Sequence, residues 1–502
     1  MQRLIFFRYQ QCGFLSSSTV ERCYNTASTL VVSNHFPDAS ASAAGVRTQS
    51  LLEGLANSSQ NVHLATAVSG GKYNRRSSSG EATVSQVTGR SSTPVAATAP
   101  DIIDELARRN ISWSWLPPNR SQRMQDFFRQ YPHFDTILLD RFYTEEAYSF
   151  AMKNNYPDAA LILDMQDMHS LRGGRETVVR DWDAKYNQQN DHDPLNVLES
   201  VMAHIPAVDN PQLLRELGSI HRCDLTLVCS PYELQLLEHV YGISSGKLSL
   251  APFFVPTETI RPMTSEIRHS QNDAHSFVFC GGFKHAPNID AVRLLLRTIW
   301  PQIRAQLPTA QLHIHGAYCP MEFQQAHNPV ETGIHVHGYT PSLETVWDRP
   351  GSVLLAPLRF GAGIKGKIID AWTYGMPVVT TPVGAEGMTT MARKGDEKSF
   401  GGDIAWTIED FVELAVQLVV TTKQYVDAAQ RGQELLCEMQ NRETNWTRVA
   451  SAIDQVRVDL HQRRSVDYTR ALLWHHSTRS TEYFSRWIEL KETSTDKEKN
   501  AR

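Results

Sequence analysis

A glycine-rich loop in the second half of the chain has residue types suited to binding a diphosphate. It contains the glycines Gly361, Gly363 and Gly366 and the basic residues Arg359 and Lys365. Glycine lets backbone N–H groups come close to a ligand. A helix is predicted directly after the loop, at 367–374, and its N-terminus adds a partial positive charge. The loop therefore predicts a site for a diphosphate.

The same loop reads G-x-G-x-x-G, so a dinucleotide-binding oxidoreductase is the first alternative. That fingerprint follows the first strand of its domain, whereas here the loop follows the fourth predicted strand of the second half. An acidic residue should close the next strand to bind the ribose, but Thr380 and Thr381 stand there. A glycine hinge without a ligand is the other interpretation.

A second glycine pair, Gly281 and Gly282, follows a predicted strand at 277–280. Ligands of open α/β sheets bind at the carboxyl ends of the strands. We therefore expect the backbone at Gly282 to face the same ligand, although a tight turn would have the same composition.

Two series of apolar strands separated by helical stretches must position these loops. The first series is predicted at 30–32, 61–68, 111–116, 136–139, 160–164, 225–230 and 247–251. The second is predicted at 277–280, 311–315, 333–338, 352–358 and 378–381, followed by helical segments at 410–439 and 446–463. Such alternation predicts an α/β protein with two doubly wound parallel sheets.

The expected domain organisation follows from these series and from composition. We expect a disordered or targeting extension at 1–28, an N-terminal Rossmann-like domain at 29–255, a linker at 256–275, a C-terminal domain at 276–430, crossing helices at 431–465 and a polar tail at 466–502. Residues 69–100 are rich in Ser, Gly, Thr and Ala, and they are expected to form a disordered low-complexity insertion.

Two segments of the second half resemble the group 1 glycosyltransferases, glycosyltransferase family 4. They read FVFCGGFKHAPNIDAVRLLLRTIWPQI and LLAPLRFGAGIKGKIIDAWTYGMPVVTTPVGAEGM. The resemblance is clear over about 275–390 and weaker in the first half. It implies the GT-B architecture, in which two Rossmann-like domains face a cleft. The C-terminal domain would bind the nucleotide-sugar donor and the N-terminal domain the acceptor, with terminal helices crossing between them.

The resemblance also implies roles for single residues on the donor side. Arg359 and Lys365 would be catalytic, because they would neutralise the leaving diphosphate as the glycosidic bond breaks. The backbone at three glycines would hold this diphosphate: Gly282, Gly361 and Gly363. Asp370 stands where the family usually has a glutamate that binds the ribose. Glu386 is a further expected donor-binding residue.

This chain departs from the family at Ala362, where the first glutamate of the family's E-x7-E pair would fall. The loss of this carboxylate keeps a non-catalytic binding module of the same fold open as an alternative function.

In the N-terminal half, His169 would be catalytic, because it resembles the histidine that touches the transferred sugar, although a loop histidine could instead cap the helix that follows. Gly45 and Arg47 resemble the loop that brings the acceptor close to the donor phosphate. Arg172 and Arg175 share a helix face and would hold an acidic acceptor or remain solvated.

The resemblance implies a retaining transfer without metal or cofactor, in which the acceptor attacks from the face of the leaving group. The two D-x-D sequences, at 181–183 and 191–193, are interpreted as surface. The pairs His313/His315 and His335/His337 would each share one face of a strand. They could form a zinc-like set of imidazoles, but we predict no metal.

Composition limits the partners. The net charge of −5 gives no bulk attraction to nucleic acid, and no apolar stretch is long enough to cross a membrane. The seven cysteines are scattered, which indicates reduced thiols. The arginines and serines of residues 1–29 suit a mitochondrial presequence as well as an untargeted extension, so the expected location is cytoplasmic or mitochondrial. Sugar, base, acceptor and oligomeric state are not predicted.

Overall fold

The computed structural model describes residues 28–38, 42–58, 61–68, 99–118, 120–186, 192–261, 275–340, 342–389, 400–476 and 487. Almost all of the predicted extension 1–28 and insertion 69–100 lies outside these residues. So do most of the predicted linker and the end of the polar tail.

The N-terminal half contains a seven-stranded parallel sheet with the order β3-β2-β1-β4-β5-β6-β7. Its strands are β1 (Ser28–Ser33), β2 (Asn61–Thr66), β3 (Ile111–Trp115), β4 (Thr136–Asp140), β5 (Ala160–Gln166), β6 (Leu225–Val228) and β7 (Leu248–Leu250). The order reverses between β1 and β4, and in open α/β sheets the carboxyl ends of the strands at such a point form the binding edge.

The C-terminal half contains a six-stranded parallel sheet with the order β10-β9-β8-β11-β12-β13. Its strands are β8 (Ser276–Cys280), β9 (Gln311–His315), β10 (Ile334–Gly338), β11 (Val353–Ala356), β12 (Val378–Thr380) and β13 (Gly402–Ile404). Here the order reverses between β8 and β11. The two glycine loops of the sequence follow these two strands.

Helices connect the strands of both sheets. Those of the N-terminal half are α2 (Ala43–Asn57), α4 (Ala99–Arg108), α5 (Ser121–Gln130), α6 (Phe142–Asn155), α7 (His169–Tyr186), α8 (Leu198–Ala203), α9 (Pro211–Arg222) and α10 (Pro231–Gln235). Those of the C-terminal half are α11 (Ala286–Leu294), α12 (Trp300–Gln306), α13 (Met321–Gln324), α14 (Leu343–Trp347), α15 (Gly366–Thr373), α16 (Pro382–Ala385), α17 (Ile408–Val420) and α18 (Thr422–Met439). None of the described helices is both long and apolar enough to cross a membrane.

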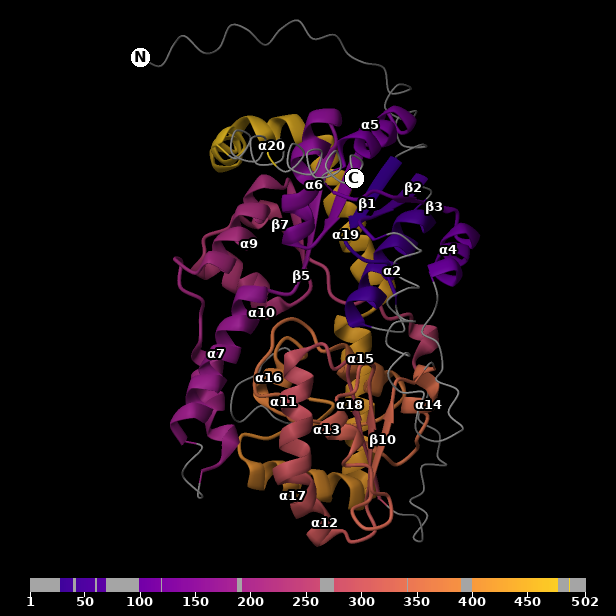
Figure 1. The fold of residues 1–502 in the computed structure, drawn as a ribbon, viewed down its shortest axis with the longest axis vertical. Helices are drawn as coiled ribbons and strands as arrows, with labels where there is room; N and C mark the ends of the chain where they lie inside the picture. Colours follow the sequence, from indigo (N-terminus) through magenta and orange to yellow (C-terminus); the bar gives the residue numbers. More distant parts are fainter. Residues whose placement is uncertain are drawn as a thin grey trace, which may run out of the picture.

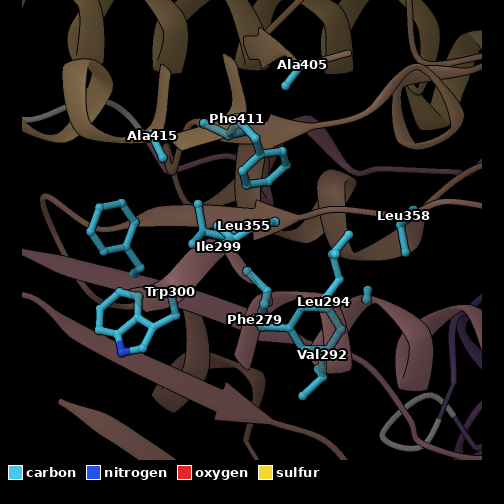
Figure 2. Packing of buried hydrophobic residues seen from close by; sticks show 14 of the residues in the cluster. Phe279, Val292, Leu294, Ile299, Trp300, Leu355, Leu358, Ala405, Phe411 and Ala415 are labelled. Carbon is cyan, nitrogen blue, oxygen red and sulfur yellow. The ribbon is translucent and has the colours of Figure 1, made fainter. Parts of the chain in front are cut away.

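The core of the C-terminal domain lies between its sheet and the helices that cover it. Phe279 and Leu355 from adjacent strands meet Ile299, Trp300 and Phe411 from the helices, and all five are at most 2% exposed (Figure 2). Burying such side chains stabilises the fold by about 1.5–3 kcal/mol each. This core fixes the strand ends from which the donor-side loops start.

Two segments cross from one half to the other. α7 and the residues after it contribute Val179, Leu198 and Val201 to the same core as Phe279, so this part of the N-terminal half packs on the C-terminal sheet's helices (Figure 1). In the other direction α19 (Arg442–Val458), continued by α20 (Leu460–Val466), returns to the N-terminal sheet, where Val449 is fully buried.

The predicted fold class is confirmed: the chain forms two Rossmann-like parallel-sheet domains, and C-terminal helices cross between them. The predicted domain boundaries stay predictions. Several elements differ from expectation, among them one strand and one helical segment of the C-terminal half. The strand β13 was not predicted, and the helical segment 410–439 is divided at Thr421, whose backbone is extended (φ −101°, ψ 95°).

Candidate active site

The loop before α15 lies against the N-terminal domain. Gly363 has a positive φ of 66°, a conformation that favours glycine, and a Cβ there would stand 2.8 Å from the Cβ of Asp167. No larger residue fits at this position without displacing one of the two domains. The glycine therefore permits the contact between the loop and the end of β5.

Two ammonium groups lie at the start of α15. Lys365 is 8% exposed and its Nζ donates to the carbonyl of Gly363 at 2.7 Å, while Lys367 Nζ donates to Asn288 Oδ1 at 2.6 Å. Among the described residues, neither amine forms an ion pair with a carboxylate. Burial lowers the pKa of both, that of Lys367 to about 8. Cations without a carboxylate partner at a helix N-terminus, one buried and one half-buried, form a site for an anion.

The second glycine loop is joined to the first through Asn288. Its Nδ2 donates to the carbonyl of Gly282 at 2.9 Å, and its Oδ1 accepts from Lys367. The N–H of Gly282 donates to no residue that the structure describes. The turn after β8 and the start of α15 thus face the same space, as the sequence predicts.

Asp370 lies on the second turn of α15. No described residue donates a hydrogen bond to its carboxylate, and burial raises its pKa to about 7. A half-buried acceptor without a donor is consistent with the expected ribose contact, which stays a prediction.

Arg359 lies in a position that differs from expectation. Its guanidinium is held by Asp183 from α7, at 2.6 and 2.9 Å, and by Asp290 from α11, with 2.9 Å from Nε to Oδ2. Two carboxylates compensate its charge, so Lys365 and Lys367 are the cations free for a ligand. The interpretation of the D-x-D residues as surface is wrong for Asp183 and for Asp193, whose Oδ2 accepts from Ile408 N at 2.7 Å.

Arg175 of α7 and Glu386, after α16, form an ion pair between the domains. The two hydrogen bonds measure 2.7 Å each, and the same guanidinium donates to the carbonyl of Gly361 at 3.0 Å. Both side chains are buried, at 0% and 3% exposure. Arg175 is therefore no acceptor-holding or solvated residue, and the carboxylate of Glu386 binds Arg175 rather than facing a donor.

Glu233 of α10 links the two domains and was not identified from the sequence. Its Oε1 accepts from the N–H of Gly363 at 2.8 Å and from that of Met168 at 3.1 Å. Its Oε2 is buried without a partner. Burial, followed by the charge of Asp167, raises the pKa of Glu233 to about 8, so the carboxyl is protonated at neutral pH.

His169 is the first residue of α7 and lies beside Asp167, with 3.4 Å between Nε2 and Oδ1. The N-terminus of this helix is capped by Glu216, which accepts from His169 N at 2.6 Å. The imidazole therefore does not cap the helix. Because Asp167 touches the loop at Gly363, the structure brings His169 close to the donor side, where its predicted role is untested.

Asp167 also pairs with Arg172, the remaining arginine of the expected acceptor side. Burial acts to raise the pKa of this carboxyl, but Arg172 and His169 outweigh it and hold the pKa well below the usual range. Arg172 is 22% exposed, so its expected role at the acceptor stays a prediction.

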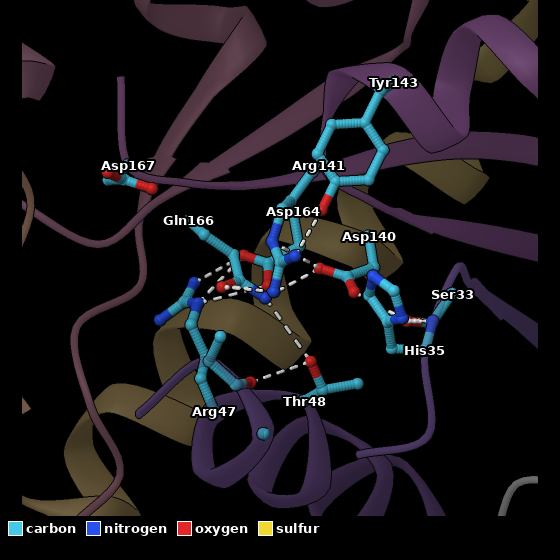
Figure 3. A network of polar contacts seen from close by, with 12 residues as sticks. Ser33, His35, Arg47, Thr48, Asp140, Arg141, Tyr143, Asp164, Gln166 and Asp167 are labelled. Atoms are coloured by element: carbon cyan, nitrogen blue, oxygen red, sulfur yellow. Dashed lines mark hydrogen bonds and ion pairs between the residues drawn. The ribbon is translucent and has the colours of Figure 1, made fainter. Parts of the chain in front are cut away.

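Gly45 and Arg47 occupy positions that do not fit the expected acceptor contact. Arg47 is 2% exposed, forms an ion pair with Asp164 at 2.6 Å and donates to the carbonyl of Pro252 at 3.1 Å (Figure 3). A Cβ at Gly45 would lie 2.0 Å from the carbonyl oxygen of Asp38. Both residues stabilise the N-terminal domain itself. The guanidinium of Arg47 is bound by groups of this domain, and Gly45 packs directly against its backbone.

A polar network at the ends of β4 and β5 was also missed from the sequence. Asp140 accepts from Ser33 Oγ at 2.7 Å and from Gln166 Nε2 at 2.6 Å, and Arg141 Nη2 donates to Gln166 Oε1 at 3.2 Å (Figure 3). Arg141 and Gln166 have positive φ values of 73° and 60°. Such strained backbone clusters at functional sites, which makes this strand edge the candidate acceptor side.

The comparisons with known proteins concern the family and the fold. Residues 274–410 match the family model described as Glycosyl transferases group 1. This part of the chain is similar to the group 1 glycosyltransferases. The match contains Lys365, Lys367 and Asp370, and it confirms the family resemblance. No curated protein matches the sequence.

Solved glycosyltransferase structures share the fold of both domains. Sucrose-phosphate synthase of Thermosynechococcus elongatus has a TM-score of 0.56 and 14% identity, with 86% of this chain and 99% of that chain covered. HepE of Anabaena, in complex with UDP and glucose, has a TM-score of 0.55 and 10% identity, with 86% and 100% covered. At these identities the likeness shows the GT-B fold.

Proposed function

We propose that the protein transfers a sugar from a nucleotide-diphosphate donor to an acceptor, with retention of the anomeric configuration. The observation that carries this proposal is the pair of ammonium groups at the N-terminus of α15, of buried Lys365 and half-buried Lys367, neither of which has a carboxylate partner among the described residues. A diphosphate supplies the negative charge that these groups lack.

The cations act on the leaving group. As the glycosidic bond breaks, charge grows on the diphosphate oxygen, and preorganised positive groups stabilise that charge in the transition state. Lys365, Lys367 and the helix N-terminus supply this stabilisation. Arg359 reaches the diphosphate only if it leaves Asp183 or Asp290, so we assign it the smaller share and a positioning role for the loop.

The remaining residues place the sugar and the nucleotide. Asp370 accepts hydrogen bonds from the ribose, Gly282 donates its N–H to a phosphate oxygen, and His169 contacts the transferred sugar. Since the acceptor attacks from the face of the leaving group, no protein nucleophile is required, and positioning supplies the rest of the acceleration. The charge is balanced by the protein, so the proposed transfer is independent of metal ions.

The base of the nucleotide-sugar donor is chosen for testing from a structural neighbour. HepE of Anabaena, which has the same fold, was solved with UDP and glucose. UDP-sugars are therefore the first donors to test.

A second candidate is a binding module that holds the nucleotide sugar without transfer. The observation in its favour is Ala362, which packs against the hydrophobic core of the N-terminal domain where the family has a carboxylate. The oxidoreductase alternative is not pursued, because residues 274–410 match glycosyltransferases.

The test is a panel of nucleotide sugars with simple glycosides and with water as acceptors. Release of nucleoside diphosphate, with the product anomer determined by NMR, supports transfer with retention when Lys365→Ala abolishes it and Lys423→Ala, an exposed lysine of α18, does not. Binding of a donor without release across the panel supports the binding module. Activity in the presence of a chelator tests metal independence.

A further inference from the structure

Four histidines gather at one edge of the C-terminal sheet, on the strand β10 and its neighbour β9. His313 and His335 are paired in register, and their rings lie 4.5 Å apart. His315 and His337 follow two residues later, so they share the same face of the sheet. Nothing in the proposed transfer uses these imidazoles.

Three of them have ligand atoms close enough to share one ion. One nitrogen each of His313, His335 and His337 lies within 4.8 Å of the other two. His313 Nδ1 and His337 Nε2 are 3.0 Å apart. Two nitrogens bound to one tetrahedral zinc at about 2.0–2.1 Å are about 3.3 Å apart, so a small rotation of one ring admits the ion.

Neighbouring side chains orient these rings by hydrogen bonds, as the partners of metal-bound histidines do. His335 Nε2 lies 2.6 Å from Gln311 Oε1, which can only accept, so the proton is on Nε2 and the lone pair of Nδ1 is free. His315 stacks on His337 at 4.3 Å and is fixed through Nδ1 by Thr340 Oγ1 at 2.8 Å. His315 is 2% exposed, and its Nε2 is a buried atom without a partner.

The chemistry of the side chains selects the kind of ion. No carboxylate joins the group among the described residues. Ca²⁺ and Mg²⁺ require oxygen ligands, whereas imidazoles suit Zn²⁺ and its transition-metal neighbours.

We propose that His313, His335 and His337 bind one divalent transition-metal ion, with Zn²⁺ as the expected occupant and water in the fourth position. The ion would tie β10 to β9 and so stabilise the edge of the sheet. This site is separate from the proposed transfer and does not depend on it.

The test uses the untagged full-length chain after treatment with a chelator. Titration calorimetry with Zn²⁺ is expected to show saturable binding of one ion, and the unfolding temperature is expected to rise with Zn²⁺ because the ion binds the folded state. Co²⁺ in place of Zn²⁺ is expected to give the visible absorption of a tetrahedral complex. His337→Ala and His335→Gln should each weaken Zn²⁺ binding at least tenfold. Loss of a residue that only hydrogen-bonds a metal ligand already weakens binding by about 10–100-fold, and loss of the ligand itself should cost more.

Two further variants sharpen the result. His461→Asn, an exposed histidine of α20, should bind Zn²⁺ as the wild type does. Arg349→Gln should bind it more tightly, because a positive charge near the ion is removed. Absence of saturable binding in the wild type overturns the proposal. So does binding that survives both His335→Gln and His337→Ala in chains that circular dichroism shows to be folded.

Discussion

Arg175 and Glu386 are 211 residues apart in the chain and form a buried ion pair with two hydrogen bonds of 2.7 Å. Arg175 belongs to α7 of the N-terminal half, and Glu386 follows α16 of the C-terminal half. The same guanidinium holds the carbonyl of Gly361 at 3.0 Å, in the loop that precedes Lys365. One side chain therefore contributes both to the contact between the domains and to the position of the donor loop.

Arg175→Met should destabilise the protein by about 3–5 kcal/mol, because Glu386 is left as a buried charge without a partner. The double variant Arg175→Met with Glu386→Gln should recover most of this loss. Chemical denaturation of the wild type, both single variants and the double variant measures the coupling. Equal losses in Arg175→Met and in the double variant would show that the pair does not act as a unit.

Lys365→Ala should lower kcat by about 10²–10³, the range measured when one donor to a developing oxyanion is removed. Lys367→Ala should act in the same direction, since its amine lies at the same helix N-terminus. Steady-state kinetics with the best donor of the panel measure both effects. An effect confined to KM would mean that these amines hold the donor equally in the ground state and the transition state.

Donor binding should depend on pH through Asp370. Its carboxyl has a pKa of about 7, so it is protonated at lower pH and then accepts hydrogen bonds from the ribose less well. Affinity for a nucleotide sugar should rise by about tenfold between pH 5.5 and 7.5, since a hydrogen bond to a charged group contributes about 1.5–3 kcal/mol. This range lies below the pKa of Lys367, at about 8.

Calorimetric titrations at several pH values measure this dependence, and Asp370→Asn is the control. The variant should bind more weakly at pH 7.5 and show a flat profile. A parallel rise in the wild type and in Asp370→Asn would assign the titration to another group.

Glu233 should make the stability of the protein fall as the pH rises. Its pKa is raised from 4.5 to about 8 in the folded chain, so the folded state keeps a proton that the unfolded state releases. The stabilising contribution is complete below about pH 4.5 and is lost as the pH rises through about 8. Between about pH 5 and 8.5, the unfolding temperature should fall less steeply in Glu233→Gln than in the wild type, because the amide of the variant has no such proton to lose. Identical profiles would contradict the assignment.

Much of the fold could be predicted because buried parallel strands are continuous apolar runs. The predicted strand at 160–164 corresponds to β5, and that at 277–280 to β8. β13 was missed, since Gly402–Ile404 is short and begins with a glycine. A Cβ added at Gly402 would lie 1.8 Å from the carbonyl oxygen of Val378. Such close packing between strands leaves no pattern in the sequence.

The grouping of Gly361, Gly363, Lys365 and Asp370 could be predicted because these residues are close in sequence. The partners of Arg359 and Arg175 could not be predicted. Arg359 meets Asp183 over 176 residues, and Arg175 meets Glu386 over 211 residues. These pairs exist because α7 packs on the C-terminal domain, a tertiary contact that the polar sequence of 171–186 does not indicate.

The most direct test of the diphosphate site compares nucleosides, monophosphates and diphosphates of each base by their effect on the unfolding temperature. A ligand that binds the folded state raises this temperature by mass action. We predict that at least one nucleoside diphosphate raises it clearly, that the matching nucleoside does not, and that Lys365→Ala removes the shift. No shift with any nucleoside diphosphate, or a shift unchanged in Lys365→Ala, would contradict the account.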